Sequence, residues 1–337
     1  MGKVSTPNIE IGKPTLDLMK QSLVWDDHLC MPLRPDDTSF LVELKRVKAS
    51  GVDIISLNIG FDLVPWENGI KMLSTFRHWV KARPKDYILI ETVDDVKLAR
   101  EANKLGIMFD LEGGCGIDDH LPMIELYYDL GVRWMLFAYN LNNSLAGGCQ
   151  DNNMGFTDFG RDVICEMERV GMGICCSHIS HQAVMEVLDV VTKPVIFSHS
   201  NPKAICGHYR SIEDEAMIGC AKTGGLVAIN GIGDLMGNND ASTEHFLRHI
   251  DYSVGLIGAD HVGLGTDYVF DEAELMNFIK NNPKRFDPEC YSDKFNMVAP
   301  EQIPEIAEGL LKVNYKEEEV KKILGENHLR VAKEVWK

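Results

Sequence analysis

Residues 174–200 read ICCSHISHQAVMEVLDVVTKPVIFSHS, and this stretch decides the fold. Two short apolar runs, GICC at 173–176 and PVIF at 194–197, each end in Ser-His, at His178 and His199. The segment between them, 181–191, has the apolar spacing of a helix. A strand, a helix and a second strand form a unit whose two strands are parallel. We therefore expect both histidines at the carboxyl ends of neighbouring strands.

The same alternation of strand-length runs and helical segments recurs along the chain. Continuous apolar runs are typical of strands that are buried on both faces, as in a closed barrel or a doubly wound sheet. The helical segments are 38–49, 93–105, 121–130, 158–170, 181–191 and 212–223. Several of these segments end at a glycine where a C-cap is expected. These glycines are Gly51, Gly106, Gly131, Gly171 and Gly224.

The strand candidates number nine, whereas a (β/α)₈ barrel has eight places. They are 22–28, 52–59, 87–92, 106–114, 133–140, 173–178, 194–200, 225–232 and 261–268. We predict an α/β fold, a (β/α)₈ TIM barrel, with 87–92 lying outside it. No linker or repeat divides the chain, so residues 1–337 are predicted to form one domain, which the helices of 315–336 close.

The composition limits the partners. The chain has 34 Lys and Arg against 51 Asp and Glu, a net charge of −17, which repels phosphate backbones and anionic membrane surfaces. We expect no nucleic-acid and no membrane partner. No apolar run is long enough to span a bilayer, and residues 1–20 lack the apolar region of a secretory signal, so we expect a cytoplasmic protein. The nine cysteines are never spaced C-x-x-C, which is typical of reduced, mostly buried cysteines.

Polar side chains end several of the apolar runs. The active site of a barrel lies at the carboxyl ends of its strands, so such residues are candidates for chemistry. Two imidazoles and a carboxylate suit Zn²⁺ or a similar divalent ion and leave positions for water, and one carboxylate can bridge two ions about 3.5–4 Å apart. The pattern predicts a hydrolase site with one or two metal ions. Its residues are His28, Glu112, His178, His199 and Asp267.

A lone histidine at a strand end is more often a hydrogen-bonded structural residue than a ligand. The repetition of such residues in successive units favours a shared site. His181 is expected on the first turn of the next helix, without a role in the chemistry. The remaining histidines are expected to face solvent; they are His78, His120, His245, His249, His261 and His328.

Residues 155–231, GFTDFG through GLVAING, resemble the membrane (renal-type) dipeptidase family, zinc enzymes with a (β/α)₈ barrel. The likeness extends from VWDDH at 24–28 to GENHLRVAKEVW at 325–336. The resemblance implies that Glu112 bridges two zinc ions, that His178 and His199 bind one of them, and that His28 helps to bind the other.

The resemblance also implies that Arg210, in HYRSIEDE at 208–215, holds the substrate carboxylate and that Asp267 is the acid/base group. Three residues depart from the family. Cys30 stands where the family's His-x-Asp motif has its aspartate; a thiolate can bind zinc at about 2.3 Å, or that metal position is lost. Tyr139 replaces a histidine that stabilises the tetrahedral intermediate, and its phenol can donate to an oxyanion. Ile232 replaces an aromatic residue.

The sequence thus predicts a zinc-dependent metallo-dipeptidase that cleaves a dipeptide or a similar small carboxylate-bearing amide. Two alternatives stay open. Cys30 favours a non-catalytic or single-metal relative that binds a small amino-acid-like ligand. Tyr139 and Ile232 favour a hydrolase of a non-peptide amide or lactam. A homo-oligomer also stays open.

Overall fold

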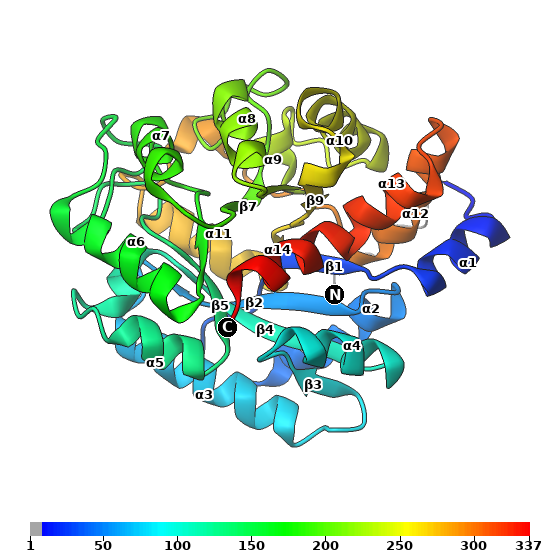
Figure 1. Cartoon of the computed structure of the whole chain (residues 1–337), viewed down its shortest axis with the longest axis horizontal. Coiled ribbons are helices and arrows are strands. Elements are labelled where there is room, and N and C mark those ends of the chain that lie inside the picture. Colours follow the sequence, from blue (N-terminus) through cyan, green and yellow to red (C-terminus); the bar gives the residue numbers. More distant parts are fainter. Residues whose placement is uncertain (1–8) are drawn as a thin grey trace.

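The structure is a computed structural model that describes residues 9–337 (Figure 1). Eight parallel strands close into a barrel in the order β1-β2-β4-β5-β6-β7-β8-β9, and β1 pairs with β9 through Asp26 and Leu264. The predicted (β/α)₈ barrel is confirmed. Its strands are β1 (Trp25–Cys30), β2 (Ile54–Phe61), β4 (Leu105–Glu112), β5 (Val132–Leu136), β6 (Gly173–Cys175), β7 (Ile196–Ser200), β8 (Leu226–Ile229) and β9 (Val262–Leu264).

Two short strands lie off this closed path. The strand β3 (Tyr87–Leu89) pairs only with β4, so the prediction that 87–92 lies outside the barrel is confirmed. The strand β10 (Tyr268–Val269) follows β9 and pairs with the end of β1. This pairing holds the chain after β9 beside His28 and Cys30.

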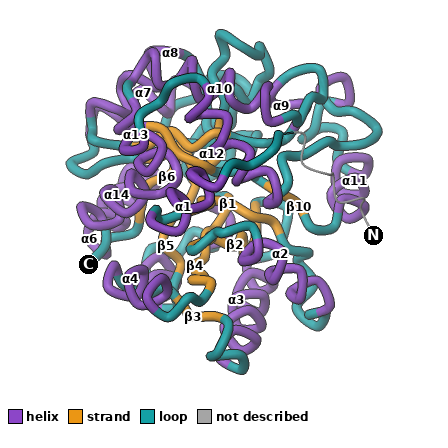
Figure 2. The backbone as a smooth tube through the Cα atoms, turned by 90° about the vertical axis from the view of Figure 1, so that its right-hand side faces the viewer, coloured by secondary structure: helices purple, strands orange, loops and turns teal. Residues whose placement is uncertain are grey.

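The helices form a layer around the strands (Figure 2). Their N-termini are capped by side chains where the sequence allows it, as at Thr157 before α6 and Ser180 before α7. The helices are α1 (Lys13–Gln21), α2 (Leu44–Ala49), α3 (Trp66–Lys81), α4 (Val93–Glu101), α5 (Met123–Asp129), α6 (Asp158–Val170), α7 (His181–Val190), α8 (Asp214–Lys222), α9 (Gly233–Met236), α10 (Thr243–Ile257), α11 (Glu272–Asn281), α12 (Ile303–Lys312), α13 (Glu317–Lys321) and α14 (Asn327–Val335).

Four of the five predicted glycine C-caps have a positive φ, as a left-handed cap requires: Gly51, Gly131, Gly171 and Gly224. The prediction for Gly106 was wrong. The helix α4 ends at Glu101, Asn103 takes the left-handed conformation with a φ of 51°, and Gly106 lies inside β4. A Cβ at Gly106 would lie 2.6 Å from Ile54 and 2.7 Å from Ile90, so the glycine is needed for close packing.

The amino-terminal end of the barrel is sealed by a cluster that we call the floor: Trp25, Trp134, His328 and Trp336. The ring centroids of Trp336 lie 5.9 Å from Trp25 and 5.5 Å from Trp134, and His328 stacks on Trp25 at 5.6 Å. The expectation that His249 and His328 face solvent was wrong, because both are fully buried. The helix α14, red in Figure 1, contacts β8 and β9 from this side.

Further expectations concern membrane spans, residues 1–8 and the cysteines. Among residues 9–337, no helix is both long and apolar enough to cross a membrane. The expectations about a leader segment and about a single domain over 1–337 include residues 1–8. These residues lie outside the described residues. All nine cysteines are unpaired, but only Cys175, Cys176 and Cys220 are buried.

Candidate active site

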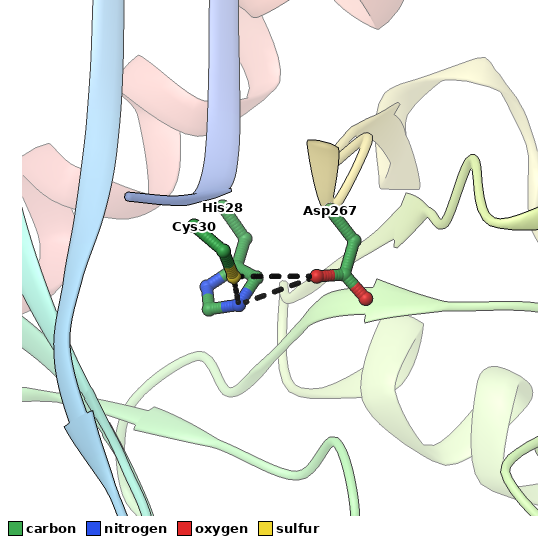
Figure 3. A group of neighbouring side chains, drawn as sticks. All are labelled: His28, Cys30 and Asp267. Atoms are coloured by element: carbon green, nitrogen blue, oxygen red, sulfur yellow. Dashed lines mark hydrogen bonds and ion pairs between the residues drawn. The ribbon is translucent and has the colours of Figure 1, made fainter. Parts of the chain in front are cut away.

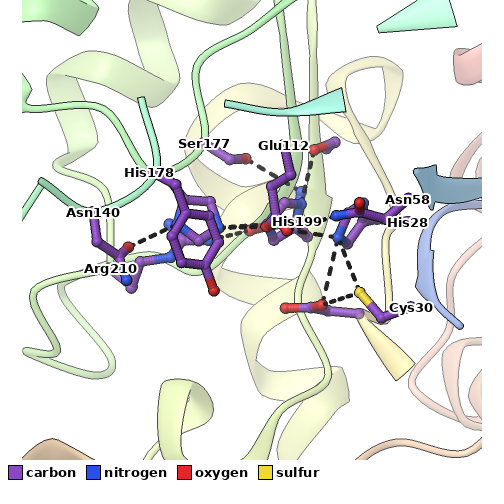
Figure 4. Close-up of polar contacts among 12 residues, drawn as sticks. His28, Cys30, Asn58, Glu112, Asn140, Ser177, His178, His199 and Arg210 are labelled. Atoms are coloured by element: carbon purple, nitrogen blue, oxygen red, sulfur yellow. Dashed lines mark hydrogen bonds and ion pairs between the residues drawn. The ribbon is translucent and has the colours of Figure 1, made fainter. Parts of the chain in front are cut away.

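The structure brings all eight predicted site residues to the carboxyl-terminal end of the barrel. Figure 4 labels His28, Cys30, Glu112, His178, His199 and Arg210. Most come from the last residues of a strand or from the loop directly after one. His28 and Cys30 lie on β1, Glu112 ends β4, and His199 lies on β7. Tyr139, His178 and Asp267 follow β5, β6 and β9 by three residues, and Arg210 lies in the loop between β7 and α8.

Three donor atoms converge at the first candidate metal position. The Nε2 atoms of His178 and His199 are 2.9 Å apart, and Oε1 of Glu112 lies 2.8 Å from the first and 3.2 Å from the second. Burial holds the pKa of both histidines well below its usual range, so their imidazoles are neutral and can donate lone pairs. Neutral imidazoles and a carboxylate that face one point fit a divalent cation such as zinc.

A second group, drawn in Figure 3, consists of His28, Cys30 and Asp267. Nε2 of His28 lies 3.4 Å from Sγ of Cys30 and 3.6 Å from Oδ1 of Asp267, and Sγ lies 3.6 Å from the same oxygen. Oε1 of Glu112 is 3.7 Å from Nε2 of His28, so Glu112 borders both positions. The donor atoms of His28, Cys30 and Asp267 also lie close enough together to hold one ion.

Burial and charge act in opposite directions in this second group. Burial alone would lower the pKa of His28, but the carboxylates of Asp110 and Glu112 and the thiolate form of Cys30 raise it well above its usual range. Burial raises the pKa of Glu112 to about 8 and also raises the pKa of Asp267. Because buried carboxylates disfavour their charged form, a cation between them would offset that cost.

Partners on the far side of each imidazole hold its Nε2 towards the centre. This arrangement fixes the orientation of a ligand ring. Nδ1 lies beside Oδ1 of Asp110 in His28 (3.1 Å), Oδ1 of Asn140 in His178 (2.7 Å) and Oγ of Ser198 in His199 (2.8 Å). Sequence reasoning missed all three partners. A signal existed for Asp110, because it precedes Glu112 by two residues on one strand and thus shares its face.

Two asparagines support the site carboxylates in the same way. Asn58 Nδ2 donates to Glu112 Oε2 at 2.6 Å, and Asn230 Nδ2 donates to Asp267 Oδ2 at 2.8 Å. Each amide oxygen accepts the backbone N–H two residues further on, at 2.6 and 2.7 Å, which fixes the amide orientation. Both residues were missed, although each follows or ends an apolar run as the predicted residues do.

The backbone is held in an uncommon conformation at two of the predicted site residues. His178 has a φ of 68° and Asp267 a φ of 56°, which place both in the left-handed region. Residues other than glycine adopt this region at a cost, and such residues gather at functional sites. The loops after β6 and β9 therefore turn sharply enough to aim these side chains inward.

Arg210 is a buried cation with only 4% of its surface exposed. Its Nη2 donates to the backbone oxygen of His199 at 3.2 Å, which fixes the guanidinium beside the candidate metal ligands. Within residues 9–337, no ion pair joins it to a carboxylate. A buried guanidinium with free donors fits the carboxylate of a small ligand.

Tyr139 lies against His178, with ring centroids 4.3 Å apart and planes inclined by 24°. Burial raises the pKa of its phenol well above the usual range, so the hydroxyl stays protonated and can donate a hydrogen bond. Tyr139 and Ile232 both line the cavity that opens over Glu112.

Residues 17–280 match the family model described as membrane dipeptidase, peptidase family M19. The chain belongs to the membrane dipeptidase family. Among curated proteins, this chain is 31% identical over 210 residues to an uncharacterised dipeptidase of Schizosaccharomyces pombe. The matched residues cover 59% of this chain and 50% of that protein. It is 29% identical over 259 residues to dipeptidase 3 of Homo sapiens, at 74% and 49% coverage. The chain thus spans about half the length of these relatives.

Solved structures share the fold of this family member. An amidohydrolase from Pseudomonas aeruginosa superposes with a TM-score of 0.87 at 23% identity, covering 96% of this chain and 99% of that chain. The probable dipeptidase PvdM from the same organism gives 0.78 at 16% identity, with 96% and 98% covered. A metallopeptidase from Rhodobacter sphaeroides, liganded with a phosphinate mimic of the dipeptide L-Ala-D-Ala, gives 0.77 at 17% identity, with 94% and 100% covered.

A cavity lies over the candidate metal site, and its volume is about 820 Å³ when its open mouth is included. Cys30, Glu112, His178, Arg210 and Asp267 reach it from the barrel. Its remaining wall is mostly apolar and comes largely from 269–295. A concave apolar pocket with a few convergent polar groups is typical of a small-molecule site.

Proposed function

We propose that this protein is a metal-dependent hydrolase that cleaves the amide bond of a dipeptide or a similar small carboxylate-bearing amide. One observation carries the proposal: the Nε2 atoms of His178 and His199 and an oxygen of Glu112 lie within 3.2 Å of one another, at a cavity that Glu112, His178 and Arg210 line. Membership of the membrane dipeptidase family supports it. The dipeptide mimic bound to the Rhodobacter sphaeroides relative supports the choice of substrate class.

The metal in this proposal is zinc. His178, His199 and Glu112 would hold one ion, and His28, Cys30 and Glu112 a second. Imidazole and thiolate donors suit zinc better than magnesium or calcium, which prefer oxygen ligands. When bound, zinc supplies a Lewis acid for the scissile carbonyl and lowers the pKa of a bound water.

The side chains of this chain then bind the substrate and move its protons. The Arg210 guanidinium binds the terminal carboxylate, which sets the distance from that carboxylate to the scissile bond. Asp267 accepts the proton of the attacking water and delivers it to the leaving amine, while Asn230 keeps one of its oxygens in place. The phenol of Tyr139 donates a hydrogen bond to the oxyanion that develops on the carbonyl.

The hydrolysis test uses a panel of L,L-, L,D- and N-blocked dipeptides, each also prepared as its C-terminal amide, with and without added zinc. We expect turnover of free-carboxylate dipeptides in the zinc-loaded protein and a loss of about 10²-fold or more for the amides, because the amide leaves the Arg210 guanidinium unpaired. No turnover of any dipeptide by zinc-loaded protein would refute the proposed activity.

Cys30 decides how many ions bind. If its thiolate is a ligand, elemental analysis will find two zinc ions per chain, and iodoacetamide will alkylate residue 30 slowly until a chelator removes the metal. One zinc per chain, with alkylation indifferent to chelator, would instead make Cys30 a packing residue and Cys30→Asp a route to a second ion. Cys149, which also borders the site region but lies outside both donor groups, serves as the control thiol.

Two other functions have specific support. A single-metal relative that binds an amino-acid-like ligand without turnover is favoured by Cys30, which stands where the family's His-x-Asp motif has its aspartate. A hydrolase of a lactam or another non-peptide amide is favoured by Tyr139 and Ile232, which change the lining of the cavity. We also propose a cytoplasmic location, which the nine unpaired cysteines support.

A further inference from the structure

One part of the cavity lining is apolar. Six apolar residues that line the cavity are together called the apolar wall: Phe61, Leu275, Phe278, Ile279, Phe286 and Phe295. Most of these side chains form a hydrophobic cluster of their own, separate from the barrel core. Phe61 comes from the end of β2, and the others come from α11 and the segment after it. The wall therefore has no role in closing the barrel, and its open side faces the ligand space.

Polar contacts fix the segment that carries the apolar wall. The hydroxyls of Tyr209 and Tyr291 are hydrogen-bonded at 2.6 Å, and Ser292 donates its hydroxyl and its N–H to Asp234 at 2.6 and 2.8 Å. The aromatic rings also hold one another, since Phe61 and Phe278 meet edge to face at 5.3 Å. The wall is thus anchored to the barrel loops at several points, which preorganises its surface for a ligand.

The two carboxylates near the apolar wall have partners within the protein. Asp271 and Glu274 line the cavity on this side, and both form ion pairs with Arg34. The other oxygen of Asp271 accepts the N–H of Glu274 at 3.2 Å, and the other oxygen of Glu274 accepts the N–H of Leu33 at 3.0 Å. All four oxygens of these two carboxylates thus have a partner within the protein, whereas the six residues of the apolar wall offer no side-chain hydrogen-bond partner to a polar ligand group.

From this we infer that the substrate carries a large apolar side chain, aromatic or branched aliphatic, which packs against the apolar wall while its carboxylate meets Arg210. The inference rests on the proposed function and narrows its substrate class. Aromatic rings in edge-to-face or offset contact, and apolar area removed from water, supply the binding energy. The wall residues are specificity-determining residues, since they line the cavity and their side chains carry no donor atom for a metal.

The test measures the binding of phosphinate dipeptide mimics to zinc-loaded protein by calorimetry, so it does not depend on turnover. Four mimics are compared: Ala-Ala, Phe-Ala, Ala-Phe and a Lys-containing one. We expect one of the two Phe mimics to bind about 10-fold or more tightly than Ala-Ala, and the Lys mimic to bind no better than Ala-Ala. Equal binding of Ala-Ala and both Phe mimics overturns the inference while leaving the proposed function standing.

The remaining outcomes separate the two claims. A preference for Phe without hydrolysis of the matching dipeptides supports the inference and refutes the proposed activity. No binding of any mimic overturns both. Tighter binding of the Lys mimic than of either Phe mimic also overturns the inference, because it would mean that Asp271 or Glu274 is free to pair.

A pair of variants on α11 locates the preference. Phe278→Ala removes a half-buried ring that lines the cavity, and Met276→Ala removes a half-buried side chain that packs on the same cluster without lining the cavity. We expect Phe278→Ala to reduce the preference for the Phe mimic about 10-fold and to leave Ala-Ala binding unchanged, whereas Met276→Ala changes neither. Thermal unfolding checks that both variants fold. An unchanged preference in folded Phe278→Ala, or an equal loss in Met276→Ala, contradicts the role of the wall.

Discussion

The two ends of the barrel are built from the same strands and carry opposite kinds of side chain. On β1, Trp25 belongs to the floor at the amino-terminal end, and His28, three residues further on, belongs to the site. The ring centroids of the three floor tryptophans lie 5.5–6.5 Å apart, whereas each site imidazole is paired with a polar partner. The direction of a strand thus separates stability from chemistry within a few residues.

The difference also appears in the energetics of the two ends. At the site, burial holds the pKa of His178 and His199 below its usual range and raises that of Glu112 to about 8, and each shift reflects a charged form that folding disfavours. The left-handed backbone at His178 and Asp267 adds a further cost. The floor contains no carboxylate and offsets this cost through apolar burial. Substitutions at the two ends should therefore change different quantities.

The largest effect is expected from the two histidines that face Glu112. His178→Ala and His199→Ala should each remove one metal ion per chain and lower kcat/KM by about 10⁴-fold or more, because the donors act as one unit. The double variant should be no worse than either single one. Metal content and steady-state kinetics measure both quantities. The control is His181→Ala, since His181 lies three residues after His178 but pairs with Glu215 on α8. A single variant with full metal content and a near-normal rate would remove that histidine from the site.

Asp267→Asn should spare the metal and slow the reaction. The amide keeps the shape of the side chain but cannot accept the proton of the attacking water, so kcat should fall about 10²–10⁴-fold with metal content and dipeptide-mimic binding retained. Asp162→Asn, an exposed site on α6, controls for the change of charge. Loss of an ion in Asp267→Asn would make Asp267 a ligand instead of the acid/base group.

The barrel could be predicted from the sequence because its strands are continuous apolar runs, and several site residues could be predicted because they end those runs. Asn58 and Asn230 end such runs as well, but an asparagine has no single chemical meaning until the carboxylate that it supports is placed beside it. The apolar wall could not be predicted, because its residues have no helical or strand period that distinguishes a cavity lining from a core. The assignment of Gly106 failed because glycine serves both to end helices and to allow close packing.

At the floor, Trp336→Ala should lower the free energy of unfolding without changing the site. Its ring contacts Trp25 and Trp134, and the loss of a large buried side chain costs about 3–5 kcal/mol. Denaturant unfolding measures the change, and kcat per folded molecule and zinc content should stay at the level of the unmodified protein. Trp66→Ala on α3, where the ring is only half-buried, should cost less. A loss of zinc in folded Trp336→Ala would mean that the two ends are coupled.

The smallest effect concerns the pH dependence of stability at the floor. Burial lowers the pKa of His328 to about 3, whereas the unfolded value is about 6.5. Below pH 6.5 the unfolded chain binds a proton that the folded chain does not bind. The contribution of His328 is therefore fully present above pH 6.5 and falls by about 1.4 kcal/mol per pH unit as the pH decreases towards 3.

His328→Phe removes this titration and keeps a ring that can stack on Trp25. Denaturant unfolding at pH 7, 6 and 5 should show a shallower decline for the variant than for the unmodified protein, whatever the cost of the larger ring at pH 7. His249, whose pKa burial lowers to about 4, titrates in both proteins and cancels in the difference. The site carboxylates cancel in the same way. Parallel declines would mean that water reaches His328 in the folded protein, and the floor would then be less tightly sealed than its packed rings indicate.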